Sequence, residues 1–133
     1  MDIKSEQEML NFGREYASKI VRPVVIELVG DVGTGKTTFV RGLAEGLGVR
    51  EPVTSPSFTI SKSYALPEGG RLIHYDFYRL SEPGIMKDDL VDNMKDEKNI
   101  LVVEWGESVA ELLPKKHTKI EIEYTEDGRR III

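Results

Sequence analysis

Residues 24–39 read VVIELVGDVGTGKTTF, an apolar run followed by a glycine-rich turn and then Lys-Thr-Thr. From residue 30 to residue 37 the chain matches G-x-x-x-x-G-K-[ST], the pattern of a loop that holds phosphate between a strand and a helix. The apolar run supplies the strand, and apolar residues at helical spacing after Lys36 supply the helix. The stretch predicts an α/β, P-loop NTPase-like fold of three layers, with a mixed sheet of parallel core strands and antiparallel hairpins.

Each fixed position of this loop has a physical role in binding phosphate. Glycines let the backbone curl so that successive N–H groups point at phosphate oxygens, and the following helix adds the positive end of its dipole. We expect Lys36 to reach the β- and γ-phosphates, Thr37 to ligate Mg²⁺ and Thr38 to bond the α-phosphate of a nucleotide. The other residues expected to contact the nucleotide are Asp31, Val32, Gly33, Thr34 and Gly35. The alternative is a chance match in a glycine-rich turn, and the flanking strand and helix argue against it.

The rest of the chain reads as short helices and strands around this unit. Ser5 followed by Glu8 forms a capping box at the start of an amphipathic helix. Asp127-Gly128 between two apolar runs is a strong hairpin signal. The expected helices cover residues 5–20, 36–46 and, briefly, 107–113; the expected strands cover 24–29, 58–65, 71–77, 100–104, 119–124 and 130–133; residues 81–99 read as a loop with one weak helix.

Length and composition limit the classes of function. The 133 residues suffice for a single domain with one core, residues 1–133. A net charge of −5 argues against DNA binding by bulk electrostatics but permits a protein partner. The absence of cysteine excludes disulfides and thiolate metal sites. Because the N-terminus lacks a signal-peptide core and no apolar run is long enough to cross a bilayer, we expect a cytoplasmic protein with no membrane partner.

Phosphate binding alone does no chemistry, and two acids are candidates for the rest of the site. Glu104 follows the apolar run ILVV, and Asp76 lies in HYDFYR at the end of an expected strand. Ligands of parallel α/β sheets bind outside the carboxyl ends of the strands. Glu104 therefore fits a Walker-B-type acid near the metal, and Asp76 fits if its strand ends there. For each, the alternative is a solvated acid that caps a strand.

Other features have a functional and a structural interpretation. The loop TSPSF, residues 54–58, follows the phosphate-loop helix where nucleotide switches sense the γ-phosphate, but it also reads as an ordinary surface turn. His74, on the same strand face as Asp76, either positions a catalytic group or is a satisfied core histidine. Trp105 could stack on a base or a partner, and packing is its default interpretation.

Taken together, these motifs resemble those of the TsaE family, the bacterial ATPases of tRNA threonylcarbamoyladenosine biosynthesis. The resemblance rests on four blocks in the family's order: GDVGTGKTTFVRGLAEGLG, VTSPSFTI, HYDFYRL and VVEWGE. The phosphate loop is shared by many families, whereas the combination of S-P-x-F, H-x-D-x-Y-R-L and E-W is specific. The expected capped N-terminal helix also fits.

The resemblance implies a small ATPase that binds ATP and Mg²⁺ and works with two partners, TsaD and TsaB. That complex modifies adenosine 37 of tRNAs that read codons beginning with A. The chain would drive or reset the TsaB–TsaD complex, meet tRNA indirectly through it, and not transfer the group itself. By motif, Lys36 and Thr37 keep the roles above, Asp76 is the metal-shell acid, Glu104 is the catalytic acid that also belongs to the metal site, and Trp105 is its partner beside the nucleotide. Residues 54–58 would be the switch-like loop, and Glu6 would lie near the base.

The sequence departs from the family at Ser57, where Thr is usual, and at Gly106, where Pro is common; residues 81–99 match poorly. Ser57 keeps a hydroxyl, and the poorly matched segment puts a partner contact in doubt. Three other functions remain alternatives. A small-molecule kinase needs an Arg-rich lid that is not evident, a GTPase needs an N-K-x-D segment that the chain lacks, and a nucleotide-sensing module would have no use for Glu104.

Overall fold

The computed structural model describes residues 1–54, 56, 61–77 and 84–133. Its elements in chain order are β1 (Asp2–Ile3), α1 (Glu6–Ala17), β2 (Val24–Val29), α2 (Lys36–Gly46), β3 (Ser61–Ala65), β4 (Arg71–Asp76), α3 (Ile85–Met94), β5 (Ile100–Glu104), the 3₁₀ helix η1 (Gly106–Leu112), β6 (Thr118–Tyr124) and β7 (Arg129–Ile132). Most of the proposed switch loop, the first residues of the expected strand 58–65, and Tyr78 and Arg79 of the HYDFYR motif lie outside the described residues.

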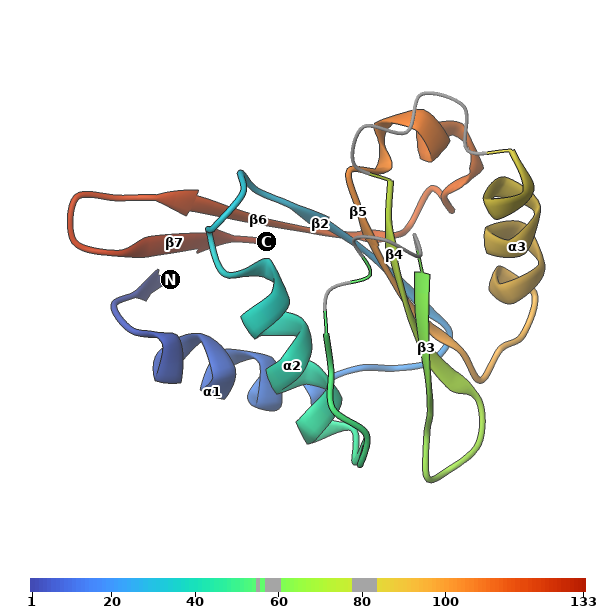
Figure 1. Ribbon diagram of the computed structural model, residues 1–133, viewed down its shortest axis with the longest axis horizontal. Helices are drawn as coiled ribbons and strands as arrows, with labels where there is room; N and C mark the ends of the chain where they lie inside the picture. Colours follow the sequence, from blue (N-terminus) through green and yellow to red (C-terminus); the bar gives the residue numbers. More distant parts are fainter. Residues whose placement is uncertain (55, 57–60, 78–83) are drawn as a thin grey trace.

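The seven strands of the described residues form one sheet in the order β1-β7-β6-β2-β5-β4-β3 (Figure 1). The central pairs β6–β2, β2–β5 and β5–β4 are parallel, while β3 and the β6–β7 hairpin add antiparallel pairs at the edges. Parallel strands end at a common edge, so β2, β4, β5 and β6 deliver the segments that follow them to one side of the sheet. The expected mixed sheet is confirmed.

Helices cover both faces of the sheet, which confirms the three-layer arrangement (Figure 1). Side chains alternate along a strand, so β5 sends Ile100 and Val102 into the core beneath α1 and α2. Leu101 and Val103 enter a second core beneath α3 and η1. By the same alternation His74 and Glu104 belong to the α2 face, which is the face that carries the phosphate loop.

Glycines bring α1 and α2 into close contact. A Cβ on Gly42 would lie 2.3 Å from the Leu10 carbonyl oxygen, and one on Gly13 would lie 2.5 Å from the Phe39 carbonyl oxygen. Only glycine permits this approach of two backbones. At the start of α1, Ser5 Oγ accepts the Glu8 N–H at 3.1 Å, which confirms Ser5 as the cap. The Glu8 carboxylate accepts the N–H of Lys4 and not that of Ser5, so the second bond of the expected capping box is shifted by one residue. The packing fixes the first turn of α1 beside the first turn of α2.

The structure corrects several expected boundaries. α1 ends at Ala17 rather than at residue 20, β1 was not expected, and the short helix after β5 is 3₁₀. The one weak helix expected within residues 81–99 is present as α3, which is ten residues long. The polar sequence of α3 gives only a weak helical signal. Tertiary contacts stabilise the helix: Leu90 is buried, and Asp89 Oδ2 accepts the Tyr75 hydroxyl at 2.6 Å.

Across the described residues, every helix is too short or too polar to span a bilayer.

Candidate functional site

The phosphate loop occupies the turn between the end of β2 at Val29 and the start of α2 at Lys36. Gly33 and Gly35 have φ angles of 83° and 106°, a left-handed conformation that favours glycine. Thr34 is buried, and its hydroxyl donates to the Asp31 carbonyl oxygen at 2.8 Å. The strand, glycine turn and helix start are therefore those that the sequence predicted. Thr37 and Thr38 follow as half-buried residues in the first turn of α2.

Lys36 lies at the centre of the site. Its side chain is buried, and its ammonium donates to the Gly30 carbonyl oxygen. The same nitrogen lies 3.6 Å from Glu104 Oε1 and 4.4 Å from the centroid of the Trp105 ring. An ammonium enclosed by a carbonyl, a carboxylate and an aromatic face is compensated in a place from which water is largely excluded.

Glu104 is a buried acid and not a solvated strand cap, because only 4% of it is exposed. It ends β5, and its Oε2 is hydrogen-bonded to Nε2 of His74 on the neighbouring strand β4. The two carboxylate oxygens of Glu104 thus face different partners, His74 on one side and Lys36 on the other. His74 Nδ1 is buried and has no partner among the described residues. Of the two interpretations of His74, the geometry favours positioning, because the side-chain hydrogen bond that His74 makes within the described residues is to the carboxylate of Glu104.

Asp76 is the last residue of β4, as its proposed role required, and pairs in register with Glu104. The two acids therefore leave adjacent parallel strands at the same edge of the sheet, beside the loop that follows β2. Asp76 is half-buried, whereas Glu104 is buried. The structure thus brings both acids and Lys36 to one end of the sheet.

Trp105 leaves the end of β5 with φ 54°, a left-handed conformation that is uncommon for a large side chain. This turn places its half-buried ring against the Lys36 ammonium, and the ring also packs on the core beneath α3. Trp105 lines a cavity of about 550 Å³ together with Gly30 and Asp31. Trp105 therefore packs on the core and also lies beside the phosphate loop.

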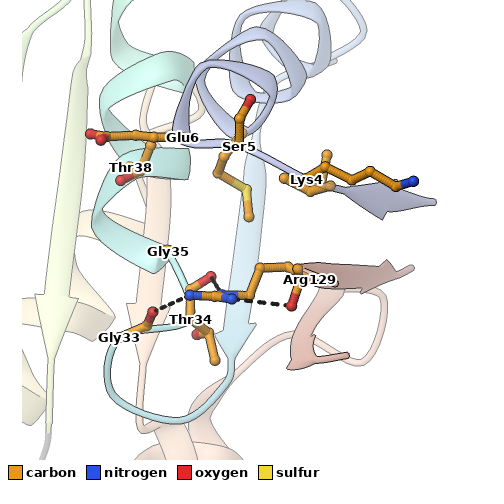
Figure 2. A pocket seen from close by; sticks show the side chains of 11 residues that line it. Lys4, Ser5, Glu6, Gly33, Thr34, Gly35, Thr38 and Arg129 are labelled. Atoms are coloured by element: carbon orange, nitrogen blue, oxygen red, sulfur yellow. Dashed lines mark hydrogen bonds between the residues drawn. The ribbon is translucent and has the colours of Figure 1, made fainter. Parts of the chain in front are cut away.

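A second cavity, of about 450 Å³, opens between the start of α1, the phosphate loop and the start of β7. Figure 2 shows its labelled lining, in which Glu6 of α1 and Thr38 of α2 border the same space above Gly33, Thr34 and Gly35. Glu6 Oε1 also lies 3.4 Å from Nη1 of Arg41 on α2. Glu6 therefore lines a cavity that adjoins the loop, and its expected place near a bound base stays a prediction.

Sequence reasoning missed two residues of the site, Tyr124 at the end of β6 and Arg129 at the start of β7. Arg129 donates to the carbonyl oxygens of Gly33 and Thr34, and Tyr124 donates to that of Val32. Figure 2 shows Arg129 reaching from β7 to the loop. Neither residue belongs to a recognisable motif. The sequence did indicate the hairpin around Asp127-Gly128, but it does not show that the β6 strand of this hairpin pairs with β2.

The residues present fit a nucleotide with Mg²⁺. Within the described ranges no three His, Cys, Asp or Glu side chains gather into a metal cluster. Mg²⁺ in nucleotide sites does not need one, since it uses one or two protein ligands, waters and phosphate oxygens. Thr37 offers a hydroxyl, and the neighbouring strand ends offer Asp76 and Glu104. Glycines with positive φ and a cationic lysine provide the phosphate side.

Comparisons with known proteins agree with these features. A family model described as "Threonylcarbamoyl adenosine biosynthesis protein TsaE" matches residues 3–132. Curated proteins named "tRNA threonylcarbamoyladenosine biosynthesis protein TsaE" are similar to the chain. The Haemophilus influenzae protein is 31% identical over 97% of this chain and 84% of its own length. The Streptomyces coelicolor protein is 40% identical over 86% and 78%, and the Treponema pallidum protein is 36% identical over 97% and 94%. A crystal structure of YdiB from Bacillus subtilis matches with a TM-score of 0.77 and 32% identity, covering 98% of this chain and 80% of that chain.

Proposed function

The chain belongs to the TsaE family, and on that premise we propose that it binds Mg·ATP and hydrolyses it as the accessory ATPase of tRNA threonylcarbamoyladenosine synthesis. We further propose that it acts in the cytoplasm on a TsaB–TsaD complex, which carries out the transfer to adenosine 37 of the tRNA. The relatives' names support the pathway, and the phosphate loop supports the nucleotide.

One observation carries the proposal for hydrolysis: Glu104 is buried between His74 and the phosphate-loop lysine. A binding module needs the loop and the lysine alone. It has no need of a carboxylate that is buried, hydrogen-bonded by a histidine and placed at a strand end beside the phosphate-loop lysine. Buried charges cost free energy, so an arrangement of this kind is typical of a catalytic site.

In the proposed reaction, Lys36 and the loop amides bind and orient the phosphate chain. Thr37 and Asp76 would hold magnesium, which supplies positive charge to the phosphate oxygens when bound. Glu104 orients the attacking water, and His74 keeps the carboxylate of Glu104 in place. Oxygen of that water forms the new bond to the γ-phosphorus, and the bond between the γ-phosphorus and the oxygen that bridges it to the β-phosphorus breaks. One proton of the water stays on the new oxygen, the other passes to a γ-phosphate oxygen, and ADP and dihydrogen phosphate leave.

The experiment measures ATP turnover by the pure protein, alone and with purified TsaB and TsaD. We expect slow turnover alone and a marked increase with both proteins, with Lys36→Ala as the inactive control. Isothermal calorimetry with Mg·ATP tests binding separately. If the folded protein takes up no Mg·ATP, alone or with both partners, the proposal fails. If phosphate appears on an added hydroxyl acceptor instead of in solution, the protein is a kinase.

A further inference from the structure

Side chains of the β6–β7 hairpin are hydrogen-bonded to the phosphate loop on the side away from Glu104. Tyr124 donates its hydroxyl to the Val32 carbonyl oxygen at 2.8 Å. Arg129 donates from Nη2 to the Gly33 carbonyl oxygen and from Nε to the Thr34 carbonyl oxygen, each at 3.2 Å. Three successive carbonyls of the loop are therefore bound by two side chains from another part of the chain (Figure 2 shows the Arg129 contacts). We call Tyr124 and Arg129 the hairpin clamp.

The two side chains of the clamp also hold one another. The Arg129 guanidinium carbon lies 4.3 Å from the centroid of the Tyr124 ring, and Arg129 Nη1 donates to the Gly128 carbonyl oxygen at 3.1 Å. The place of the clamp beside the loop follows from the order of the strands. β6 lies parallel beside β2, with Glu121 opposite Val29, so it runs on to Tyr124 alongside the loop that begins at Gly30.

Binding of the carbonyls determines where the loop amides point. In a trans peptide the C=O and the next residue's N–H point in opposite directions. Holding the Val32 carbonyl toward the hairpin therefore directs the Gly33 N–H away from it, and holding the Thr34 carbonyl does the same for the Gly35 N–H. The Thr34 N–H already donates to the Asp31 carbonyl oxygen at 3.3 Å within the turn. Glycine peptides rotate easily without such restraint.

We propose that Tyr124 and Arg129 are positioning residues that preorganise the phosphate loop and so raise its affinity for nucleotide. The inference rests on the proposed binding of Mg·ATP. A loop that is already ordered loses less conformational entropy when it binds its ligand, and this saving appears directly as affinity. Both side chains bind main-chain carbonyls and not the acids of the site, so we expect their loss to affect binding more than the chemical step. Arg129 also lines the cavity of about 450 Å³ beside the loop.

The experiment measures the dissociation constant of Mg·ADP by calorimetry at 25 °C for the full chain and four variants. Arg129→Met is expected to weaken binding by about tenfold, and Tyr124→Phe, which keeps the ring and loses one hydrogen bond, by about threefold to fivefold. Arg129→Lys keeps the charge and loses the two-pronged contact, so it should resemble Arg129→Met. Arg130→Met is the matched control, because Arg130 pairs with Asp2 and Glu123 and not with the loop.

Amide hydrogen exchange in nucleotide-free protein gives a readout that does not depend on ligand. Residues 33–35 are expected to exchange faster in the Arg129 variants and in Tyr124→Phe than in wild type, and at the wild-type rate in Arg130→Met. Steady-state kinetics of ATP hydrolysis separate affinity from chemistry: in Arg129→Met and Tyr124→Phe we expect KM to rise by a larger factor than kcat falls, and an equal fall in kcat and kcat/KM would overturn the assignment to binding.

Each result decides between the inferences. If the wild type and the clamp variants bind Mg·ADP equally well, the proposed role of the clamp is overturned and the proposed function stands. Arg129→Lys at wild-type affinity, or an equal loss in Arg130→Met, reduces the effect to charge and overturns it too. A lower melting temperature with unchanged affinity makes the contacts merely structural. Wild type that binds no nucleotide, with or without partners, removes both proposals.

Discussion

The phosphate loop is held from two sides by different chemistry. On the inner side, Lys36, Glu104 and His74 are 7%, 4% and 0% exposed, and they bring three ionisable groups together away from water. On the outer side, Tyr124 is 51% exposed, Arg129 is half-buried, and both bind neutral carbonyls. Charges interact most strongly where water is excluded. We therefore expect the inner side to act on charge in the proposed reaction and the outer side to act mainly on the shape of the loop.

This contrast predicts different kinetic consequences for the two sides. Variants of the inner side should change the binding of phosphate or the rate of the chemical step by large factors. Variants of the outer side should change affinity by modest factors and turnover at saturation by smaller ones. The predictions below test the inner side and then the opposite face of β4, the strand that carries His74, from the largest effect to the smallest.

Lys36→Ala is expected to weaken Mg·ATP binding by more than about 100-fold, because it removes the one buried cation of the loop from the phosphates. Calorimetry measures the loss. Lys119→Ala, which removes an exposed lysine of β6 that pairs with Glu121, is the matched control and should bind normally. An affinity within threefold of wild type for Lys36→Ala would contradict the assignment of the inner side to phosphate.

Glu104→Gln is expected to lower single-turnover hydrolysis by about 100-fold or more while Mg·ATP affinity stays within a few-fold, because the lost carboxylate acts in the chemical step. Glutamine keeps the size of the buried side chain. Rapid-quench measurements give the rate, and Glu111→Gln on the surface of η1 serves as the control. Equal rates for Glu104→Gln and wild type would remove Glu104 from the mechanism.

His74→Leu is expected to lower hydrolysis by about tenfold with little change in the affinity for Mg·ATP, since Glu104 loses the hydrogen bond that fixes one of its oxygens. His74→Gln places an amide N–H near the former Nε2 and should recover most of the rate. The ratio of the two single-turnover rates is the test. If the two variants behave alike, His74 serves packing and does not position the acid.

The sequence predicted the inner side of the loop better than the outer side, for a physical reason. Residues 24–29, 36–46 and 100–104 matched β2, α2 and β5 at both ends, because each has a strong period and clear stops. Strand ends in a parallel sheet converge, so Asp76 and Glu104 could be placed near the loop without knowing the strand order. The roles of those residues toward ATP and Mg²⁺ stay predictions.

The hairpin clamp could not be predicted in the same way, and α3 was expected only as a weak helix without bounds. Placing Tyr124 beside Val32 requires the knowledge that β6 pairs with β2, and strand neighbours distant in sequence leave no local signal. α3 is polar and weakly periodic, so its helical state depends on Leu90 and on the contacts of Asp89 and Asn93 with Tyr75. In both cases the information lies in tertiary packing and not in local spacing.

Tyr75 provides the smallest expected effect and the closest comparison, because it follows His74 on β4 and points to the opposite face. Its buried hydroxyl donates to Asp89 and accepts from Asn93, which anchors α3. Tyr75→Phe should leave nucleotide affinity and turnover unchanged and lower the free energy of unfolding by about 1 kcal/mol near pH 8. An altered affinity or turnover would mean that both faces of β4 serve the site, and the comparison would fail.

The pH dependence of this variant provides an internal check on the burial of Tyr75. Burial, and then the interaction with Asp89, raise the pKa of the Tyr75 phenol above its usual value. The folded protein thus keeps the proton where the unfolded chain loses it, so the stabilisation is complete below about pH 10 and declines as the pH rises above that value. Urea unfolding at pH 8 and pH 10.5 should show the wild type losing roughly 0.8 kcal/mol more than Tyr75→Phe. Parallel losses in the two proteins would show that the phenol titrates freely and that α3 is not anchored through it.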